Sequence, residues 1–138
     1  MMSAPLIEQK NDVATSPADC LYRAKRLLRG RGCARDYEAA VELLDLAARA
    51  GMADALYQLG KCYLKGIGCS KDPAGGVSCL ERAAMAGHAA ATYRLGDCFE
   101  NGLGAPRSAE LAAYWYRKAV ALHHPKAYQS LLRLAGRK

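Results

Sequence analysis

Four basic residues fall into two pairs that each have the spacing of one helical turn. Lys25 precedes Arg29 by four residues, and Lys61 precedes Lys65 by the same interval, 36 residues further along the chain. Residues four apart share one face of a helix, so each pair would present two neighbouring cations. The pairs could attract an acidic segment of another molecule. They would mainly accelerate its association, because each exposed ion pair contributes well under about 1 kcal/mol.

The four-residue spacing recurs 36 residues later with an acidic and a neutral residue in place of the two cations. Asp97 and Asn101 stand where the two lysines stood 36 residues earlier, so the sign of the charge reverses along the chain. Tyr57 and Tyr93 are also 36 residues apart and could anchor a ligand by stacking. The candidate partner-binding residues are Lys25, Arg29, Tyr57, Lys61, Leu64, Lys65, Tyr93, Asp97, Asn101, Gln129 and Arg133. The alternative interpretation is an ordinary solvated face with two packing tyrosines.

Six cysteines raise the question of disulfides or metal binding. Cys33 and Cys69, like Cys62 and Cys98, are 36 residues apart. In stacked helical units, equivalent positions are separated by roughly 8–10 Å, whereas a disulfide needs Cα atoms within about 7 Å. No Cys-x-x-Cys or zinc-type spacing is present. We therefore expect reduced thiols that act as small hydrophobic residues, with an oxidised or metal-bound pair as the alternative.

Catalytic signatures are absent from the sequence. It contains no Ser-x-x-Lys, Gly-x-Ser-x-Gly, His-Glu-x-x-His or phosphate-loop motif, and Gly66-Ile-Gly68 follows no strand. The adjacent His123 and His124 fit an altered turn before a last helix better than a metal site. We expect a protein without catalytic residues, metal or cofactor.

The elements that position these residues follow from an internal repeat of 36 residues. Sliding the segment 55–87 forward by 36 superposes its alanine, tyrosine, leucine, glycine and cysteine positions on the next segment without a gap. Sliding it back aligns the glycine pair, an aspartate and the alanine pair. We expect an all-α solenoid of three antiparallel helix hairpins, about 18–53, 54–89 and 90–125, with a capping helix over 126–136. Residues 1–15 are unpatterned and are expected to form a disordered arm before a single domain over 16–138.

Local signals support these hairpins. Ser16 is expected to cap the first helix, with Pro17 at its first position, and Asp36 to cap the second. Gly60 recurs at Gly96 inside a helix, which points to backbones that approach too closely for a side chain. A second group completes the expected packing: Gly76 at a close contact, Gly75 at a soft helix start, and Trp115 in a core site.

Composition bounds the remaining possibilities. About half of the 138 residues are apolar, so one core can form, and no run reaches the roughly 18 residues of a membrane span. No export signal is recognisable at the amino terminus, so we expect a soluble, cytoplasmic monomer. The net charge of +7 favours acidic partners or nucleic acid, but no nucleic-acid-reading motif accompanies it. Nucleic-acid binding remains the weaker alternative.

The pattern A-x-x-x-L-G-x-x-Y-x-x-G-x-G at 55–68 and A-x-x-W-x-x-K-A at 112–119 resembles the Sel-one-like repeat family over about residues 19–136. The resemblance implies right-handed superhelices of helix pairs, whose first helices line a concave groove, and a role as an adaptor in protein assemblies. The basic pairs favour an acidic or amphipathic segment of another protein as the bound partner. A chaperone or immunity protein that masks a secreted bacterial effector is an alternative within the same class of partner binding. Some cysteine-rich relatives with penicillin-related activity carry disulfides at positions equivalent to Ala84 and Thr92. Neither residue is cysteine here, which argues against that activity.

Overall fold

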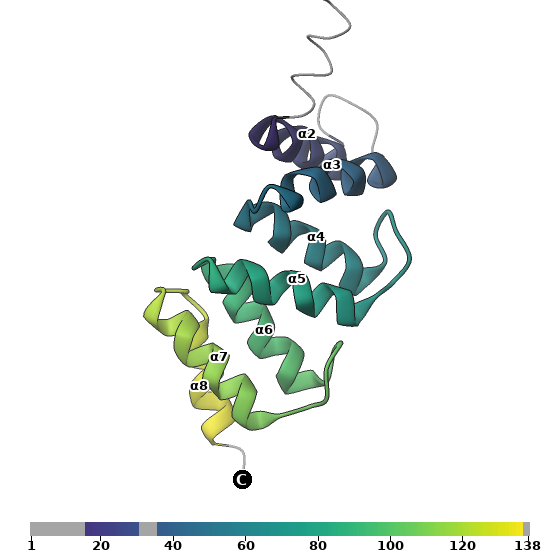
Figure 1. The fold of residues 1–138 in the computed structure, drawn as a ribbon. Coiled ribbons are helices and arrows are strands. Elements are labelled where there is room, and N and C mark those ends of the chain that lie inside the picture. Colours follow the sequence, from purple (N-terminus) through teal and green to yellow (C-terminus); the bar gives the residue numbers. More distant parts are fainter. Residues whose placement is uncertain (1–15, 31–35, 137–138) are drawn as a thin grey trace, which may run out of the picture.

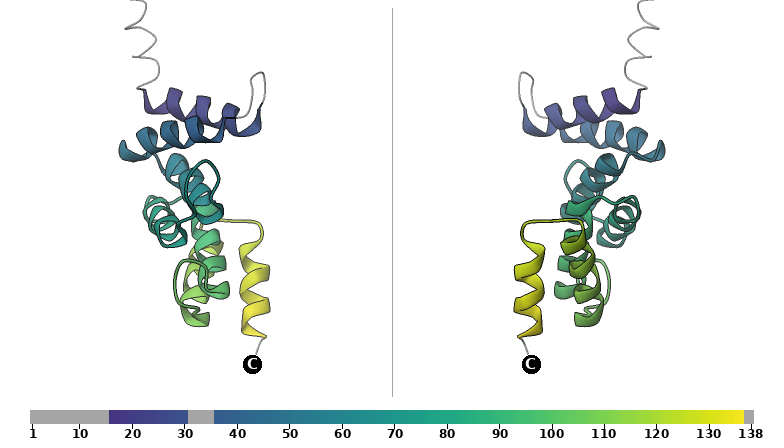
Figure 2. Two further views of the ribbon diagram at one scale, coloured as in Figure 1. Left: turned by 90° about the vertical axis from the view of Figure 1, so that its right-hand side faces the viewer. Right: turned by 90° about the vertical axis from the view of Figure 1, so that its left-hand side faces the viewer.

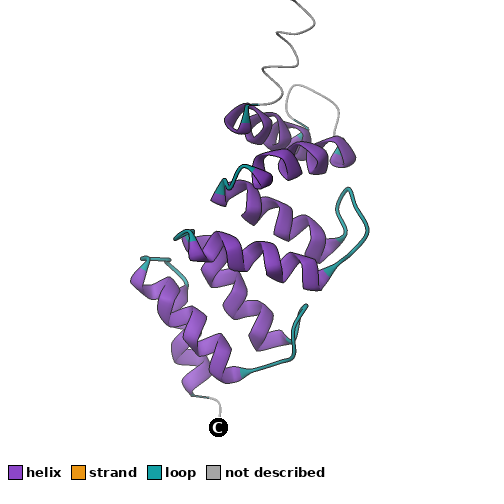
Figure 3. Ribbon diagram, viewed as in Figure 1, coloured by secondary structure: helices purple, strands orange, loops and turns teal. Residues whose placement is uncertain are grey.

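The described part of the chain is helical throughout. The computed structural model describes residues 16–30 and 36–136, which form seven helices and no strand (Figure 3). The helices are α2 (Pro17–Arg29), α3 (Tyr37–Arg49), α4 (Ala53–Lys65), α5 (Pro73–Met85), α6 (Ala89–Asn101), α7 (Ala109–Ala121) and α8 (Ala127–Ala135). The expected arm over 1–15 lies outside the described residues. Every described helix is too short or too polar to cross a bilayer.

The helices stack in chain order as an elongated array. Each helix packs on the one before and the one after it, and the closest pairs are α2 with α3, α4 with α5, and α6 with α7 (Figure 1). These are the expected hairpins, and α8 covers the open end by packing on α7 (Figure 2). The expected all-α solenoid with a C-terminal capping helix is confirmed.

Helix starts use side-chain caps at recurring positions. The Asp36 carboxylate accepts the Ala39 N–H, and the Asp72 carboxylate accepts the Gly75 N–H, both at 3.1 Å. The cap of α5 therefore has the same geometry as that of α3, and the glycines do not disturb it. Ser16 makes no side-chain cap bond, so that prediction is wrong; α2 starts with its proline at the first position.

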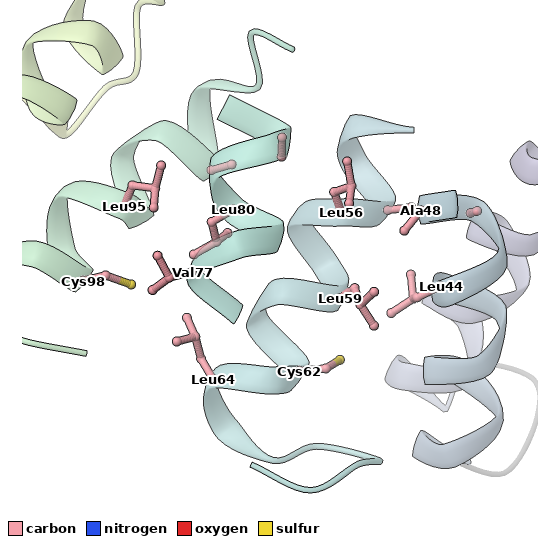
Figure 4. Packing of buried hydrophobic residues seen from close by; sticks show 14 of the residues in the cluster. Leu44, Ala48, Leu56, Leu59, Cys62, Leu64, Val77, Leu80, Leu95 and Cys98 are labelled. Carbon is pink, nitrogen blue, oxygen red and sulfur yellow. The ribbon is translucent and has the colours of Figure 1, made fainter. Parts of the chain in front are cut away.

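The core is a single row of small and branched side chains between the helices. Leu44, Leu80 and Tyr116 occupy the same register in the second helix of each hairpin, and each is 0% exposed. Figure 4 shows how leucines of neighbouring helices pack against one another in this core. Trp115, the expected core residue of α7, is half buried and packs against the core, while its neighbour Tyr116 is fully buried.

The interior glycines of the first helices serve two different purposes. A Cβ at Gly60 would lie 3.0 Å from the Gly76 carbonyl oxygen, and one at Gly76 would lie 2.8 Å from the Gly60 oxygen. The backbones of α4 and α5 do approach there as expected. A Cβ at Gly96 would instead meet the Tyr116 ring at 2.4 Å. The expectation of close backbones is therefore wrong at Gly96, where the missing side chain leaves space for an aromatic ring.

The second glycine in the α4–α5 loop and in the α6–α7 loop lies against the preceding hairpin. Gly68 and Gly104 have φ of +73°, and a Cβ would lie 2.2 Å from the Tyr37 carbonyl oxygen in one case and 2.3 Å from that of Pro73 in the other. Both carbonyls belong to the first turn of the second helix in the preceding hairpin. The loop can therefore lie against that helix only without a side chain.

Replacing Gly104 by alanine should cost far more stability than replacing Gly87. Both glycines have positive φ, which costs an alanine about 1–2 kcal/mol, but nothing lies within 4 Å of a Cβ at Gly87. At Gly104 the backbone must also move away from Pro73. We expect Gly87→Ala to lower the free energy of unfolding by about 1 kcal/mol and Gly104→Ala by more than about 3 kcal/mol, measured by urea denaturation. Equal losses would contradict this role of the loop.

Candidate partner-binding groove

The candidate partner-binding residues all lie on the first helices of the hairpins and on the capping helix. Two stand on α2, four on α4, three on α6 and two on α8. The first helices contact one another through side chains: Lys25 reaches Asp54 from α2 to α4, and Tyr93 reaches Ser130 from α6 to α8. We call this face of the array, formed by α2, α4, α6 and α8, the groove face.

A pocket of about 370 Å³ opens on the groove face between α2 and α4. The four cations expected to act together all line it: Lys25 and Arg29 from α2, and Lys61 and Lys65 from α4. Its other lining residues are Leu28, Tyr37, Gln58, Cys62 and Ile67. The structure therefore brings together two pairs of basic residues that are 36 positions apart in the sequence. We call this hollow the basic pocket.

One of these cations is already paired. The Lys25 ammonium lies 2.6 Å from the Asp54 carboxylate, and the other oxygen of that carboxylate lies 3.5 Å from His88 Nε2. Burial acts to raise the pKa of Asp54, but the hydrogen bond and charge of Lys25, helped by His88, outweigh it and lower the pKa. This network joins α2, α4 and the start of α6 across two hairpin boundaries.

The two tyrosines are stacked by histidines that recur with the same 36-residue spacing. The Tyr57 and His88 ring centroids are 4.7 Å apart, and those of Tyr93 and His124 are 4.3 Å apart. Both tyrosines are half buried, and the Lys61 ammonium lies 4.6 Å from the Tyr57 ring centroid. The expected stacking platforms thus already carry an aromatic partner from the same chain.

Each histidine also caps the backbone beside it. His88 Nδ1 accepts the Ala91 N–H at 3.1 Å, and His124 Nδ1 accepts the Lys126 N–H at 3.2 Å. A ring nitrogen that accepts a hydrogen bond carries no proton, so these bonds leave Nε2 as the protonated ring nitrogen. Burial and the Lys126 charge lower the pKa of His124, against an opposing effect of Asp97.

A second polar cluster lies toward the C-terminal end of the groove face. The Tyr116 hydroxyl lies 2.7 Å from carboxylate oxygens of both Asp97 and Glu100, and the Arg133 guanidinium forms a bidentate ion pair with Glu100. Burial and the two carboxylates raise the pKa of Tyr116, so its hydroxyl remains protonated. The bond to Glu100 raises the pKa of Arg133. This cluster ties α6, α7 and α8 together.

One of the candidate partner-binding residues is buried. Leu64 is only 8% exposed. Leu64 points into the layer between α4 and α5 (Figure 4), where a Cβ at Gly76 would lie 2.9 Å from it. Leu64 therefore does not offer its side chain to a partner, because the glycine makes room for it in the core.

The acidic side chains of α6, where the sequence predicts that the sign of the charge reverses, are also largely internal. Asp97 accepts the tyrosine hydroxyl described above and is half buried, and the buried Glu100 faces Arg133. Asn101 is exposed but donates its side-chain amide to the Asp97 carbonyl at 3.0 Å. Gln129 is exposed on α8. The sign reversal seen in the sequence is therefore weakened at the surface.

The sequence interpretation missed the residues that hold the groove face together. The signal for His88 and His124 was available, because they repeat at 36 residues like the tyrosines they stack on. The signal for Tyr116 was its spacing, because it occupies the repeat position of the buried Leu44 and Leu80 and faces Gly96. No comparable pattern marks Gln58, which lines the basic pocket.

The described residues show no group of three potential metal ligands. Burial is the main cause that raises the pKa of the Cys62, Cys69, Cys79 and Cys98 thiols, the last to about 11. Thiols with raised pKa are poor nucleophiles and poor metal ligands at neutral pH. Cys33 lies outside the described residues.

Removing Arg133 should destabilise the fold because it takes away the guanidinium charge that faces the buried Glu100 carboxylate. We expect Arg133→Gln to lower the free energy of unfolding by about 1–3 kcal/mol. The double variant Glu100→Gln with Arg133→Gln should recover most of the loss, since no buried charge remains. Arg117→Gln, at an exposed position of α7, is the matched control and should change stability by less than about 0.5 kcal/mol. A double variant as unstable as the single one would show that the charge pair does not matter.

Acidification should loosen the C-terminal end through His124. Its pKa is lowered in the folded chain, so the unfolded chain binds more protons as pH falls below its ordinary value of about 6.5. Stability from this group is complete above that pH and is lost as pH falls through the folded pKa. His124→Asn keeps a side-chain acceptor but cannot titrate, so its unfolding midpoint should fall less than that of the parent chain between pH 7 and pH 5. Parallel pH profiles would rule out this contribution.

Comparison with known proteins follows the same division of the chain. The Sel1 repeat family model matches residues 19–52, 53–88 and 89–124, which are the three hairpins. No curated protein matches the sequence.

Solved structures with the same architecture come from bacteria. A Sel1 repeat protein from Oxalobacter formigenes superposes with a TM-score of 0.79 at 30% identity, over 85% of this chain and 48% of that one. A protective antigen from uropathogenic Escherichia coli with an SLR fold gives 0.78 at 29% identity, over 80% and 24%. Cysteine-rich protein B of Helicobacter pylori gives 0.68 at 18% identity, over 80% and 90%, and shows the fold alone.

The chain spans about half the length of the Oxalobacter protein and about a quarter of the Escherichia coli protein. The matching repeats cover most of its own length, from residue 19 to residue 124. With three matched repeats and the same solenoid architecture, the chain belongs to the Sel1 repeat family.

Proposed function

We propose that this protein is a non-catalytic scaffold that holds an acidic or amphipathic segment of another protein along its groove face. The observation that carries the proposal is the convergence of cations from two hairpins on one pocket of that face. Basic residues spread at random over a solvated surface would not gather at equivalent positions of neighbouring helices. Sel1 repeat proteins are generally interaction scaffolds, which supports the same class of function.

The shape of the array favours an extended or helical partner. Four elements, α2, α4, α6 and α8, contribute side chains to one face, and their axes turn progressively along the array (Figures 1 and 2). A segment crossing them meets a similar set of positions at each hairpin. Exposed positions are available on each element, from Arg29 and Lys65 to Asn101 and Gln129. Masking of a secreted effector by a chaperone or immunity protein would use the same face and is a special case of this function.

The test must leave the internal packing intact. Tyr57 and Tyr93 support the stacked histidines, so their replacement would disturb the array as well as a partner. A photoreactive amino acid, p-benzoylphenylalanine, should instead be placed at exposed groove positions Lys65, Asn101 and Gln129 in separate variants. Arg82 and Arg117, exposed on the second helices α5 and α7, provide matched controls.

Irradiation in cells should give the same cross-linked protein from the groove positions and none from the controls. The contact is then mapped by mass spectrometry of the cross-linked peptide. Cross-links that form only from α5 and α7 would show that the partner binds the opposite face, and the proposed use of the groove would be wrong.

A further inference from the structure

The basic pocket carries an unbalanced positive charge. Of its four cations, Lys25 is neutralised by Asp54. No carboxylate of the described residues lies within ion-pair distance of Arg29, Lys61 or Lys65, and none lines the pocket. Cations that face each other from adjacent helices repel, and an anion placed between them relieves that repulsion. The pocket therefore favours an occupant with more than one negative charge.

The pocket also has an apolar wall. Leu28 and Ile67 are half buried and Cys62 is buried, and all three line the hollow beside the charged side chains. A bare phosphate would leave these surfaces uncovered, whereas a branched aliphatic side chain would bury apolar area against them. The volume of about 370 Å³ lies at the lower end of the roughly 300–1,000 Å³ of small-ligand pockets. It suits one inserted side chain with its flanking groups.

The third hairpin does not repeat this chemistry. The positions of Lys61 and Lys65 are taken by Asp97 and Asn101, and Arg133 is committed to Glu100. The clustered cations of the basic pocket are thus not repeated at the equivalent positions of α6. A bound segment would place its acidic part at the basic pocket and would have a defined direction along the array.

We propose that the basic pocket recognises a short acidic motif of a protein partner, in which an aliphatic residue lies between two carboxylate residues. The aliphatic side chain packs against Leu28 and Ile67, and the two carboxylates meet the cations of α2 and α4. This proposal rests on the proposed function, since the motif belongs to the partner segment. It specifies which sequence feature of the partner is recognised and by which pair of hairpins.

The test is a titration of the full, ¹⁵N-labelled chain with acetyl-Glu-Leu-Glu-amide, followed by NMR chemical shifts of the backbone amides. The shifts should centre on Arg29, Gln58, Lys61 and Lys65, and acetyl-Gln-Leu-Gln-amide at the same concentration should not produce them. Added salt should weaken binding because these charges are partly exposed. Lys61→Gln with Lys65→Gln should raise the dissociation constant by about fivefold or more, in line with about 0.5 kcal/mol for each exposed pair.

The matched control removes the same charge elsewhere. Arg117→Gln with Lys118→Gln, both exposed on α7, should leave the dissociation constant within about twofold, since they lie outside the pocket. An equal loss in both double variants would show that only net charge matters and would overturn the proposal. Shifts outside the pocket, no shifts at all, or inorganic phosphate binding the pocket as tightly as the acidic peptide would also overturn it. The cross-linking result is independent of this titration, so a partner captured on the groove face without peptide binding here would refute the motif and leave the scaffold function standing.

Discussion

The fold depends on one steric condition. The loop inside the second hairpin and the loop inside the third must each lack a side chain where they touch the hairpin before them. At Gly68 and Gly104 the loop lies so close to a carbonyl of the previous second helix that a Cβ would fall 2.2–2.3 Å from its oxygen. These two contacts let the second and third hairpins lie close to the hairpin before them. Leu44, Leu80 and Tyr116 can then fill equivalent sites in the layers between them.

That close stacking places the groove side chains within reach of their neighbours. Asp54 bridges Lys25 and His88, and Glu100 receives Arg133 from the capping helix. The same side chains that could meet a partner therefore also hold successive hairpins together. Substitutions on this face consequently separate into two kinds. Changes at exposed positions such as Lys65 affect the surface alone, whereas changes at stacked positions such as Tyr93 affect the array.

The repeat made most of the fold predictable, because period, loop glycines and helix starts all recur at fixed intervals. Predictions failed where one repeat uses the same position differently. Gly96 looks like Gly60 in the sequence, but it admits the ring of Tyr116 instead of another backbone. Leu64 is a candidate partner-binding residue in the sequence, yet Gly76 leaves a space in which its side chain packs in the core. Such choices depend on the volume of the residue across the interface, which the periodicity of one helix does not contain.

The electrostatic character of the groove face illustrates the same limit. Formal charges along the first helices suggest a basic half followed by an acidic half, but a charge acts on a partner only where it is not already balanced. Glu100 is buried against Arg133, and Asp97 accepts a hydrogen bond from Tyr116, so the acidic half is largely used within the protein. In the basic half, Lys25 is paired with Asp54. The charge that the basic pocket can present to a partner therefore comes from Arg29, Lys61 and Lys65, where two hairpins form that pocket.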